Sequence, residues 1–162
     1  MEHVISVLVE NKRGVLAHIA GLFSGRGFNI DSLAVGETDD RTVSRMTIVV
    51  HGDDRVLEQV TKQLNKMIDV IKVTDLNERA RIERELVLIK VAAEGPKRSE
   101  VIEVSNIFRA KVVDVTPKEM TLEATGDPQK IDAFLRLLSG FGIKEISRTG
   151  RIAISRGLNG EA

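Results

Sequence analysis

The sequence predicts an α+β fold of two tandem βαββαβ units, each an antiparallel sheet with two helices on one face. The order strand, helix, strand, strand, helix, strand can be followed in residues 1–78 and again in the rest of the chain. A highly charged stretch, residues 76–85, separates the two copies, and 162 residues suffice for two small domains. We therefore place the boundary near Arg79 and expect domains at residues 1–78 and 79–162.

The first unit shows four strand patterns and two helix patterns. Aliphatic or alternating runs predict strands at residues 4–9, 30–36, 43–51 and 70–74. From Val15, apolar residues follow a helical spacing as far as the run 25–27, where glycine can adopt positive φ and end the helix. The apolar residues of this helix that fall on one face are Leu16, Ile19, Ala20 and Phe23. A second helix is expected after Asp53, whose side chain suits an N-cap.

The second unit repeats these patterns. Strands are predicted at residues 86–93, 111–116, 120–125 and 143–149. Helices are predicted at residues 99–109 and after Asp127, where a capping residue is followed by Pro128 at the first helical position. The stretch 76–85 is expected to be a solvated connector or an extension of the flanking strand. Residues 155–162 have little apolar content and are expected to be loosely held.

The composition argues against several classes of protein. Acidic and basic residues balance at 24 each, so no strong field attracts the chain to nucleic acid or an anionic membrane. RNA-recognition sheets share this topology but stack bases on exposed aromatic residues, whereas Trp and Tyr are absent here. The sequence has no cysteine, no basic N-terminal leader and no apolar stretch of about 20 residues. We expect a cytoplasmic protein that binds neither nucleic acid nor membrane.

No residue pattern predicts catalysis or a metal site. Gly25 and Gly27 lack the third glycine of a dinucleotide-binding loop, and they follow a helix rather than a strand. The three histidines have no companion ligands at metal-binding spacing. The pairs Asp39-Asp40 and Asp53-Asp54 are ordinary in a hairpin turn and at a helix cap. No serine, histidine and acid set indicates a nucleophilic triad, so we expect neither catalytic residues nor metal ligands.

The turn between the first strand and the first helix is the main candidate for a binding site. Asn11 ends the strand, and Gly14 precedes a helix that begins with Val15 and Leu16 and has no Ser, Thr or Asp cap beside it. Free N–H groups at a helix N-terminus favour an anion, and the aliphatic residues favour a hydrocarbon group. The alternative is a simple turn into the helix. Because Asn29 occupies a comparable turn at the other end of the helix, we favour a ligand, namely an amino acid with an aliphatic side chain.

Eight segments also match the pattern of one family, and the match runs from about residue 3 to 157. They are Ser6–Asn11, Gly14–Leu16, Gly21–Phe23, Arg26–Ile30, Ser44–Ile48, Lys62–Lys66, Asp114–Pro117 and Ser155–Gly157. With these segments the chain resembles the regulatory, or small, subunits of acetohydroxyacid synthase (acetolactate synthase), the first common enzyme of branched-chain amino-acid synthesis. The resemblance implies an N-terminal ACT domain and a ferredoxin-like C-terminal domain.

The resemblance also implies a function. Members are noncatalytic subunits that activate a catalytic large subunit and make it subject to feedback inhibition by valine. Thiamine diphosphate, Mg and FAD are expected on that catalytic partner, and no cofactor is expected on this chain. Similar ACT domains pair edge to edge, which implies a homodimer with effector pockets between subunits. The implied effector site comprises Asn11, Gly14, Val15 and Leu16 of one chain with Asn29 and Ile30 of the other.

Two other interpretations of the sequence stay open. The chain can be an ACT-domain sensor that regulates a different enzyme or a transcription system, which a pull-down of its cognate catalytic chain would distinguish. It can also be a free-standing enzyme, which turnover by the purified chain alone would indicate. The C-terminal unit carries no comparable pocket signature, so its role does not follow from the residues.

Overall fold

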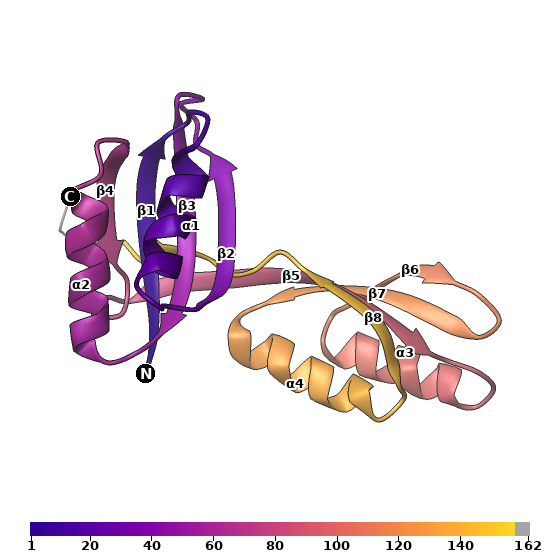
Figure 1. Cartoon of the computed structure of the whole chain (residues 1–162). Coiled ribbons are helices and arrows are strands. Elements are labelled where there is room, and N and C mark those ends of the chain that lie inside the picture. Colours follow the sequence, from indigo (N-terminus) through magenta and orange to yellow (C-terminus); the bar gives the residue numbers. More distant parts are fainter. Residues whose placement is uncertain (158–162) are drawn as a thin grey trace. The chain divides into compact units, whose positions relative to one another are not determined.

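The computed structural model describes residues 1–157, whose contacts separate them into two compact units. Among the described residues, the first unit consists of 1–82 together with 151–157, and the second consists of 83–150. Each unit contains an antiparallel sheet and two helices (Figure 1). This arrangement confirms the predicted α+β class with two tandem ferredoxin-like units.

The first unit follows the predicted order of elements. They are β1 (Glu2–Glu10), α1 (Val15–Gly25), β2 (Ile30–Glu37), β3 (Val43–His51), α2 (Asp54–Asn65) and β4 (Val70–Asp75). The strand order is β2-β3-β1-β4, with β1 antiparallel to both of its neighbours. Figure 1 shows α1 and α2 on the same side of this sheet. The opposite face of the sheet is therefore not covered by a helix of this unit.

The core of the first unit lies between its sheet and its helices, because alternate strand residues point to the same face. It comprises Ile5, Val7, Val9, Val15, Ile19, Phe23, Met46, Ile48, Val50, Val60 and Leu64. The buried face of α1 is rotated slightly from the predicted apolar face, because it includes Val15 rather than Leu16. Val15 is 3% exposed, whereas Leu16 is 47% exposed. Residues 15, 19 and 23 lie four apart, so they form one continuous stripe along the helix.

The second unit has the same plan. Its elements are β5 (Arg81–Ala92), α3 (Lys97–Ile107), β6 (Lys111–Val115), β7 (Glu119–Gly126), α4 (Pro128–Ser139) and β8 (Ile143–Arg148), and its strand order is β6-β7-β5-β8. Because β5 begins at Arg81, the second half of the charged stretch extends the strand, one of the two expected outcomes. The core includes Phe134, whose ring centroid lies 5.1 Å from that of Phe108.

The two predicted aspartate caps are confirmed. Asp53 Oδ1 accepts a hydrogen bond of 3.0 Å from the Val56 N–H, and Asp127 Oδ1 accepts one of 2.8 Å from the Lys130 N–H. Each bond satisfies an N–H group that has no partner within its helix. Pro128 follows Asp127 at the start of α4, where a missing N–H group costs no helical hydrogen bond.

Replacing Asp127 with Ala is expected to lower the free energy of unfolding of the second unit by about 1 kcal/mol, because it removes this cap. Chemical denaturation followed by circular dichroism measures the loss. Asp132→Ala is the matched control, since Asp132 is an exposed residue of the same helix. It should change the free energy by no more than about 0.5 kcal/mol. Equal losses in both variants would show that the cap does not stabilise α4.

The chain returns to the first unit after β8. A short strand, β9 (Ile152–Ser155), pairs with β5, and Ala153 is buried against Val4, Val49 and Leu76 on the face of the sheet away from the helices. The boundary near Arg79 had assigned all residues after it to the second domain, whereas residues 151–157 belong to the first unit. Ser155 lies within β9, in contrast to the expected loose tail, and the last five residues of that tail, 158–162, lie outside the described residues.

Polar contacts hold the last described segment, residues 151–157, against the first unit. The Arg151 N–H donates to Ser32 Oγ at 2.9 Å, and the Arg156 N–H donates to the Ala80 carbonyl at 2.8 Å. The Arg151 guanidinium also makes two hydrogen bonds to the Glu2 carboxylate, of 2.5 and 2.8 Å. These bonds hold the pKa of Glu2 below its ordinary value. The ion pair thus joins the first strand to the residue that precedes β9.

The coupling between Glu2 and Arg151 is expected to depend on pH. The folded-state pKa of Glu2 lies below the unfolded value, so its stabilisation is complete above the unfolded value and is lost as the pH falls through the folded value. A double-mutant cycle of Glu2→Gln and Arg151→Gln should give a coupling of about 0.2–1 kcal/mol at pH 7, because the pair is partly exposed. Denaturation at lower pH should show this coupling decline toward zero. A constant coupling would contradict the assignment of the ion pair.

Candidate functional site

Asn11 lies directly after β1 and connects the end of that strand to the β2–β3 hairpin. Its N–H donates to the Thr42 carbonyl at 2.7 Å. Its side-chain Nδ2 donates to the Arg41 carbonyl at 2.9 Å and to Glu37 Oε1 at 3.2 Å. Asn11 therefore lies beside the last residue of β2 and is bonded to the β2–β3 hairpin just before the turn that leads into α1.

Gly14 gives this turn its shape. Its φ of 85° is in the left-handed region that glycine adopts without strain. No side chain of residues 1–157 caps α1, whose first turn also contains no acidic residue. The first backbone bond of the helix runs from the His18 N–H to the Gly14 carbonyl, 2.9 Å. The N–H groups that precede His18 are thus available to an acceptor, and together with the helix dipole they favour an anion.

Val15 and Leu16 contribute differently from the expectation that both line an apolar wall. The Val15 side chain belongs to the core and is 3% exposed, so it offers almost no surface at this turn. Leu16 is about half exposed and supplies the aliphatic surface at this turn. Hence Asn11, Gly14 and Leu16 lie together at one end of α1.

Asn29 and Ile30 lie at the other end of α1. The helix has 11 residues, so it separates them from Gly14 by roughly 16 Å. Asn29 Nδ2 donates to Asp31 Oδ1 at 3.0 Å, and Ile30 packs partly against the core. Asp31 also hydrogen-bonds His51, and that bond holds the pKa of Asp31 below its ordinary value. A single chain therefore does not bring the six predicted site residues together.

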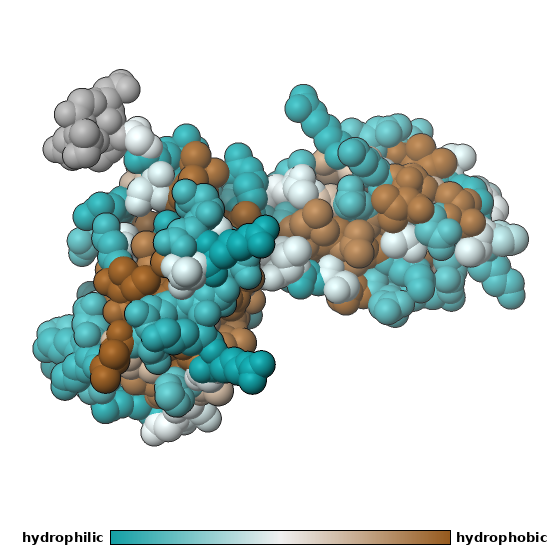
Figure 2. Space-filling view, turned by 90° about the horizontal axis from the view of Figure 1, so that it is seen from above, coloured by the Kyte–Doolittle hydropathy of each residue, from teal (hydrophilic) through white to brown (hydrophobic). Residues whose placement is uncertain are grey.

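Both edges of the first sheet carry exposed apolar side chains. Val35 on the edge strand β2 is 47% exposed, and Ile71 on the opposite edge strand β4 is 54% exposed. Figure 2 shows hydrophobic residues at the surface of both units. On the second unit they include Val113 and Val115 of β6, which is also an edge strand.

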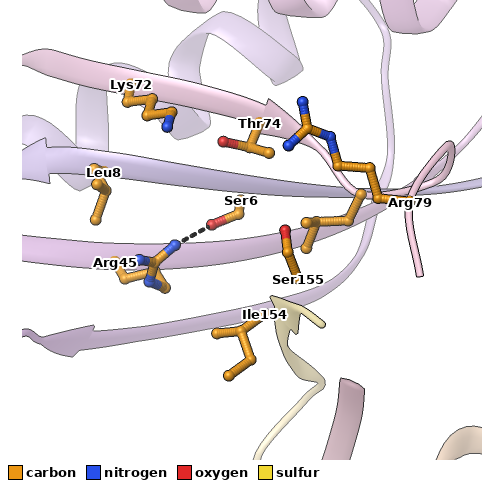
Figure 3. Close-up of a pocket in the computed structure, with 9 residues that line it drawn as sticks. Ser6, Leu8, Arg45, Lys72, Thr74, Arg79, Ile154 and Ser155 are labelled. Carbon is orange, nitrogen blue, oxygen red and sulfur yellow. Dashed lines mark hydrogen bonds between the residues drawn. The ribbon is translucent and has the colours of Figure 1, made fainter. Parts of the chain in front are cut away.

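A cavity that sequence reasoning missed lies on the face of the first sheet away from the helices. It measures about 230 Å³ and is lined by Ser6, Leu8, Arg45, Lys72, Thr74, Leu76, Arg79, Ile154 and Ser155 (Figure 3). The sequence does contain one indication of this cavity. Polar residues occur at every second position of otherwise aliphatic strands, as with Lys72 and Thr74 of β4. The contribution of β9 had no such signal.

The aspartate pairs serve the local structure, as predicted. Asp40 accepts from both the N–H and the hydroxyl of Thr42 in the hairpin turn, which lowers the pKa of Asp40, and Asp53 caps α2. In the described part of the chain, no group of three or more His, Cys, Asp or Glu side chains is arranged to hold a metal ion. No helix among the described residues is long and apolar enough to cross a membrane.

Family comparisons cover both units. Residues 5–72 match the model of the AHAS (acetohydroxyacid synthase) small subunit-like ACT domain, and residues 84–157 match the model of the small subunit of acetolactate synthase. The two matches agree with the order of units in the structure. They also extend into β9, because the second match continues to residue 157.

Individual relatives are similar over nearly their whole lengths. A probable acetolactate synthase small subunit from Methanothermobacter thermautotrophicus is 59% identical over 156 residues, which cover 96% of this chain and 93% of the relative. The acetolactate synthase small subunit of Mycobacterium bovis is 56% identical over 158 residues, covering 98% and 94%. The crystal structure of the Thermotoga maritima small subunit superposes with a TM-score of 0.88 at 43% identity, covering 98% of this chain and 99% of that one.

Proposed function

Because the chain belongs to the family of acetolactate synthase small subunits, we propose that it activates the catalytic large subunit and makes it sensitive to inhibition by valine. In this proposal the chain is noncatalytic, and the thiamine diphosphate, Mg and FAD of the reaction belong to the catalytic partner. The observation that supports an effector site here is the start of α1, which follows Gly14 and has no side-chain cap. The exposed Leu16 lies beside it.

The chemistry of this turn suits valine. The free N–H groups of the first turn of α1 can donate hydrogen bonds to the carboxylate of the ligand, and Leu16 can contact its isopropyl group. Burial of a valine side chain contributes about 1.5–3 kcal/mol, and each hydrogen bond to a charged group about 1.5–3 kcal/mol. Association costs at least about 4 kcal/mol, so the affinity is weak to moderate. A feedback sensor needs such an affinity, because it must release valine when the pool falls.

The second half of the pocket is proposed to come from another copy of the chain. Valine is much shorter than the roughly 16 Å that α1 places between Gly14 and Asn29. Asn11 contacts Glu37, the last residue of the edge strand β2, whereas Asn29 immediately precedes the same strand. If two β2 strands pair antiparallel about a twofold axis, the end of one lies beside the start of the other. This pairing supports a pocket made of Asn11, Gly14 and Leu16 of one chain with Asn29 and Ile30 of its partner.

Reconstitution tests the proposed function. The catalytic subunit is assayed for acetolactate formation alone, with this chain, and with this chain plus valine. The expected result is activation by the chain and inhibition of the activated complex by valine. Activation without any response to valine would contradict the proposal that valine is the effector. If the chain did not change the activity of the catalytic subunit, the proposal that this subunit is its partner would be contradicted.

The proposed dimer can be tested separately by a substitution on the edge strand β2. Val35→Lys is expected to weaken dimerisation of the purified chain at least tenfold, because the twofold axis brings two added charges close together across the β2 edge. Ile71→Lys adds the same charge to the other edge strand at a similarly exposed position and serves as the control. Sedimentation of both variants at micromolar concentrations measures the effect. A wild-type chain that sediments only as a monomer, or equal weakening by both changes, would contradict pairing through β2.

A further inference from the structure

The cavity on the helix-free face of the first sheet has an ordered arrangement of side chains. Leu8 of the central strand β1 lies opposite Arg45 of β3 on one side and Lys72 of β4 on the other. Two strand spacings of about 4.8 Å place the Arg45 and Lys72 backbones roughly 10 Å apart. Next along the sheet come Ser6 and Thr74, which also oppose each other. Two cations, Arg45 and Lys72 on either side of Leu8, thus lie next to the neighbouring pair of hydroxyl groups, Ser6 and Thr74.

The remaining walls come from outside these strands. Arg79 lies in the connector that precedes β5, and Ser155 lies in β9. Figure 3 shows the side-chain nitrogens of Lys72, Arg79 and Arg45 directed toward the region of the Ser6 and Thr74 hydroxyls. The guanidinium Nη1 of Arg45 donates to Ser6 Oγ at 2.7 Å, and Ser6 is only 2% exposed. This bond holds Arg45 at the wall of the cavity.

The charge of the cavity is not balanced by its own lining. Three of the nine lining residues are cationic and none is acidic, although the whole chain has equal numbers of acidic and basic residues. Like charges that face one space repel one another, and an anion between them offsets this cost. Guanidinium groups bind phosphate and carboxylate oxygens through paired hydrogen bonds, while a lysine adds a point charge and hydroxyl groups donate further bonds.

We propose that this cavity binds a small polyanion that carries two or more phosphate or carboxylate groups. A polyanion is required to match three cations, and a volume of about 230 Å³ suits a compact ligand rather than a polymer. The site lies on the opposite face of the sheet from α1 and is therefore separate from the proposed valine site. The proposal does not depend on regulation by valine.

Calorimetric titration of the full chain with inorganic pyrophosphate, and separately with citrate, tests this site in a buffer free of phosphate. Saturable binding of at least one probe is expected, and it should weaken as sodium chloride is added. Tighter binding of pyrophosphate identifies phosphate groups as the preferred chemistry, and tighter binding of citrate identifies carboxylates. Failure of both probes to bind would overturn the proposal.

Three single substitutions assign any binding to this cavity. Lys72→Gln and Arg79→Gln should each weaken binding at least about tenfold, because each removes a charged hydrogen-bonding group. Lys66→Gln removes the same charge from an exposed position after α2, outside the cavity lining, and should leave the affinity unchanged. Lys72 and Arg79 are exposed, so thermal melting should be unaltered in all three variants. Equal weakening by Lys66→Gln, or unchanged affinity in both cavity variants, would overturn the assignment.

Discussion

Replacing Gly14 with Asp is expected to abolish valine inhibition of the reconstituted holoenzyme while activation by this subunit stays largely intact. The new carboxylate would lie at the uncapped start of α1, where it occupies the anion site and repels the valine carboxylate. A Cβ atom at this position would meet no heavy atom within 4 Å, so the change causes no clash. We expect the valine concentration for half-maximal inhibition to rise by more than tenfold.

The matched control for this experiment is Gly14→Asn. Asn and Asp have nearly the same shape, and both tolerate positive φ better than other residues with side chains. The two variants therefore share the backbone strain at φ 85° and differ mainly in charge. The Asn variant should retain more of the valine response than the Asp variant. Full inhibition of the Asp variant, or equal loss in both, would contradict an anion site at this turn.

The largest effect on stability is expected from Phe134→Ala in α4. Phe134 is fully buried and its ring packs on Phe108. Truncation of a buried Phe to Ala costs about 3–5 kcal/mol through lost burial and the cavity left behind. Since a small domain is stabilised by only about 5–15 kcal/mol, the second unit should lose much of its resistance to denaturant.

Leu137→Ala provides the comparison, because Leu137 belongs to the same helix but is 51% exposed. Urea denaturation of the full chain, followed by circular dichroism, should show a transition at much lower urea for Phe134→Ala than for Leu137→Ala. Similar midpoints for the two variants would mean that Phe134 does not anchor the core of the second unit. The comparison also separates the loss of core packing from any general intolerance of α4 to alanine.

The order of elements could be predicted because each carries a local signal. Strand residues alternate or form aliphatic runs, helix residues recur every three or four positions, and Asp53 and Asp127 mark helix starts through bonds to residues three positions later. β9 carries only a weak signal, an aliphatic run of three residues, 152–154. It has four residues, and the residues it covers, such as Val4 and Val49, are more than a hundred positions away in the sequence.

The candidate site was predictable to a similar extent. Asn11 and Gly14 occupy the expected turn, because an uncapped helix start after a strand is visible in the order of residue types. The roles of Val15 and Leu16 could not be predicted with the same accuracy. A rotation of the helix by one residue decides which of the two side chains is buried, and in the structure it is Val15. The cationic cavity escaped prediction because Arg45, Lys72 and Arg79 meet only through sheet register and the return of the chain.

The return of β9 also affects how the nascent chain must fold on the ribosome. Residues 151–155 are synthesised only after residues 83–150, which takes several seconds at roughly 5–20 residues per second. During this interval the first unit can form its helix-covered core, but Val4, Val49 and Leu76 still lack the contact with Ala153. The emerging polypeptide therefore exposes an apolar patch that chaperones can bind, and the first unit is completed only after the second unit has been translated.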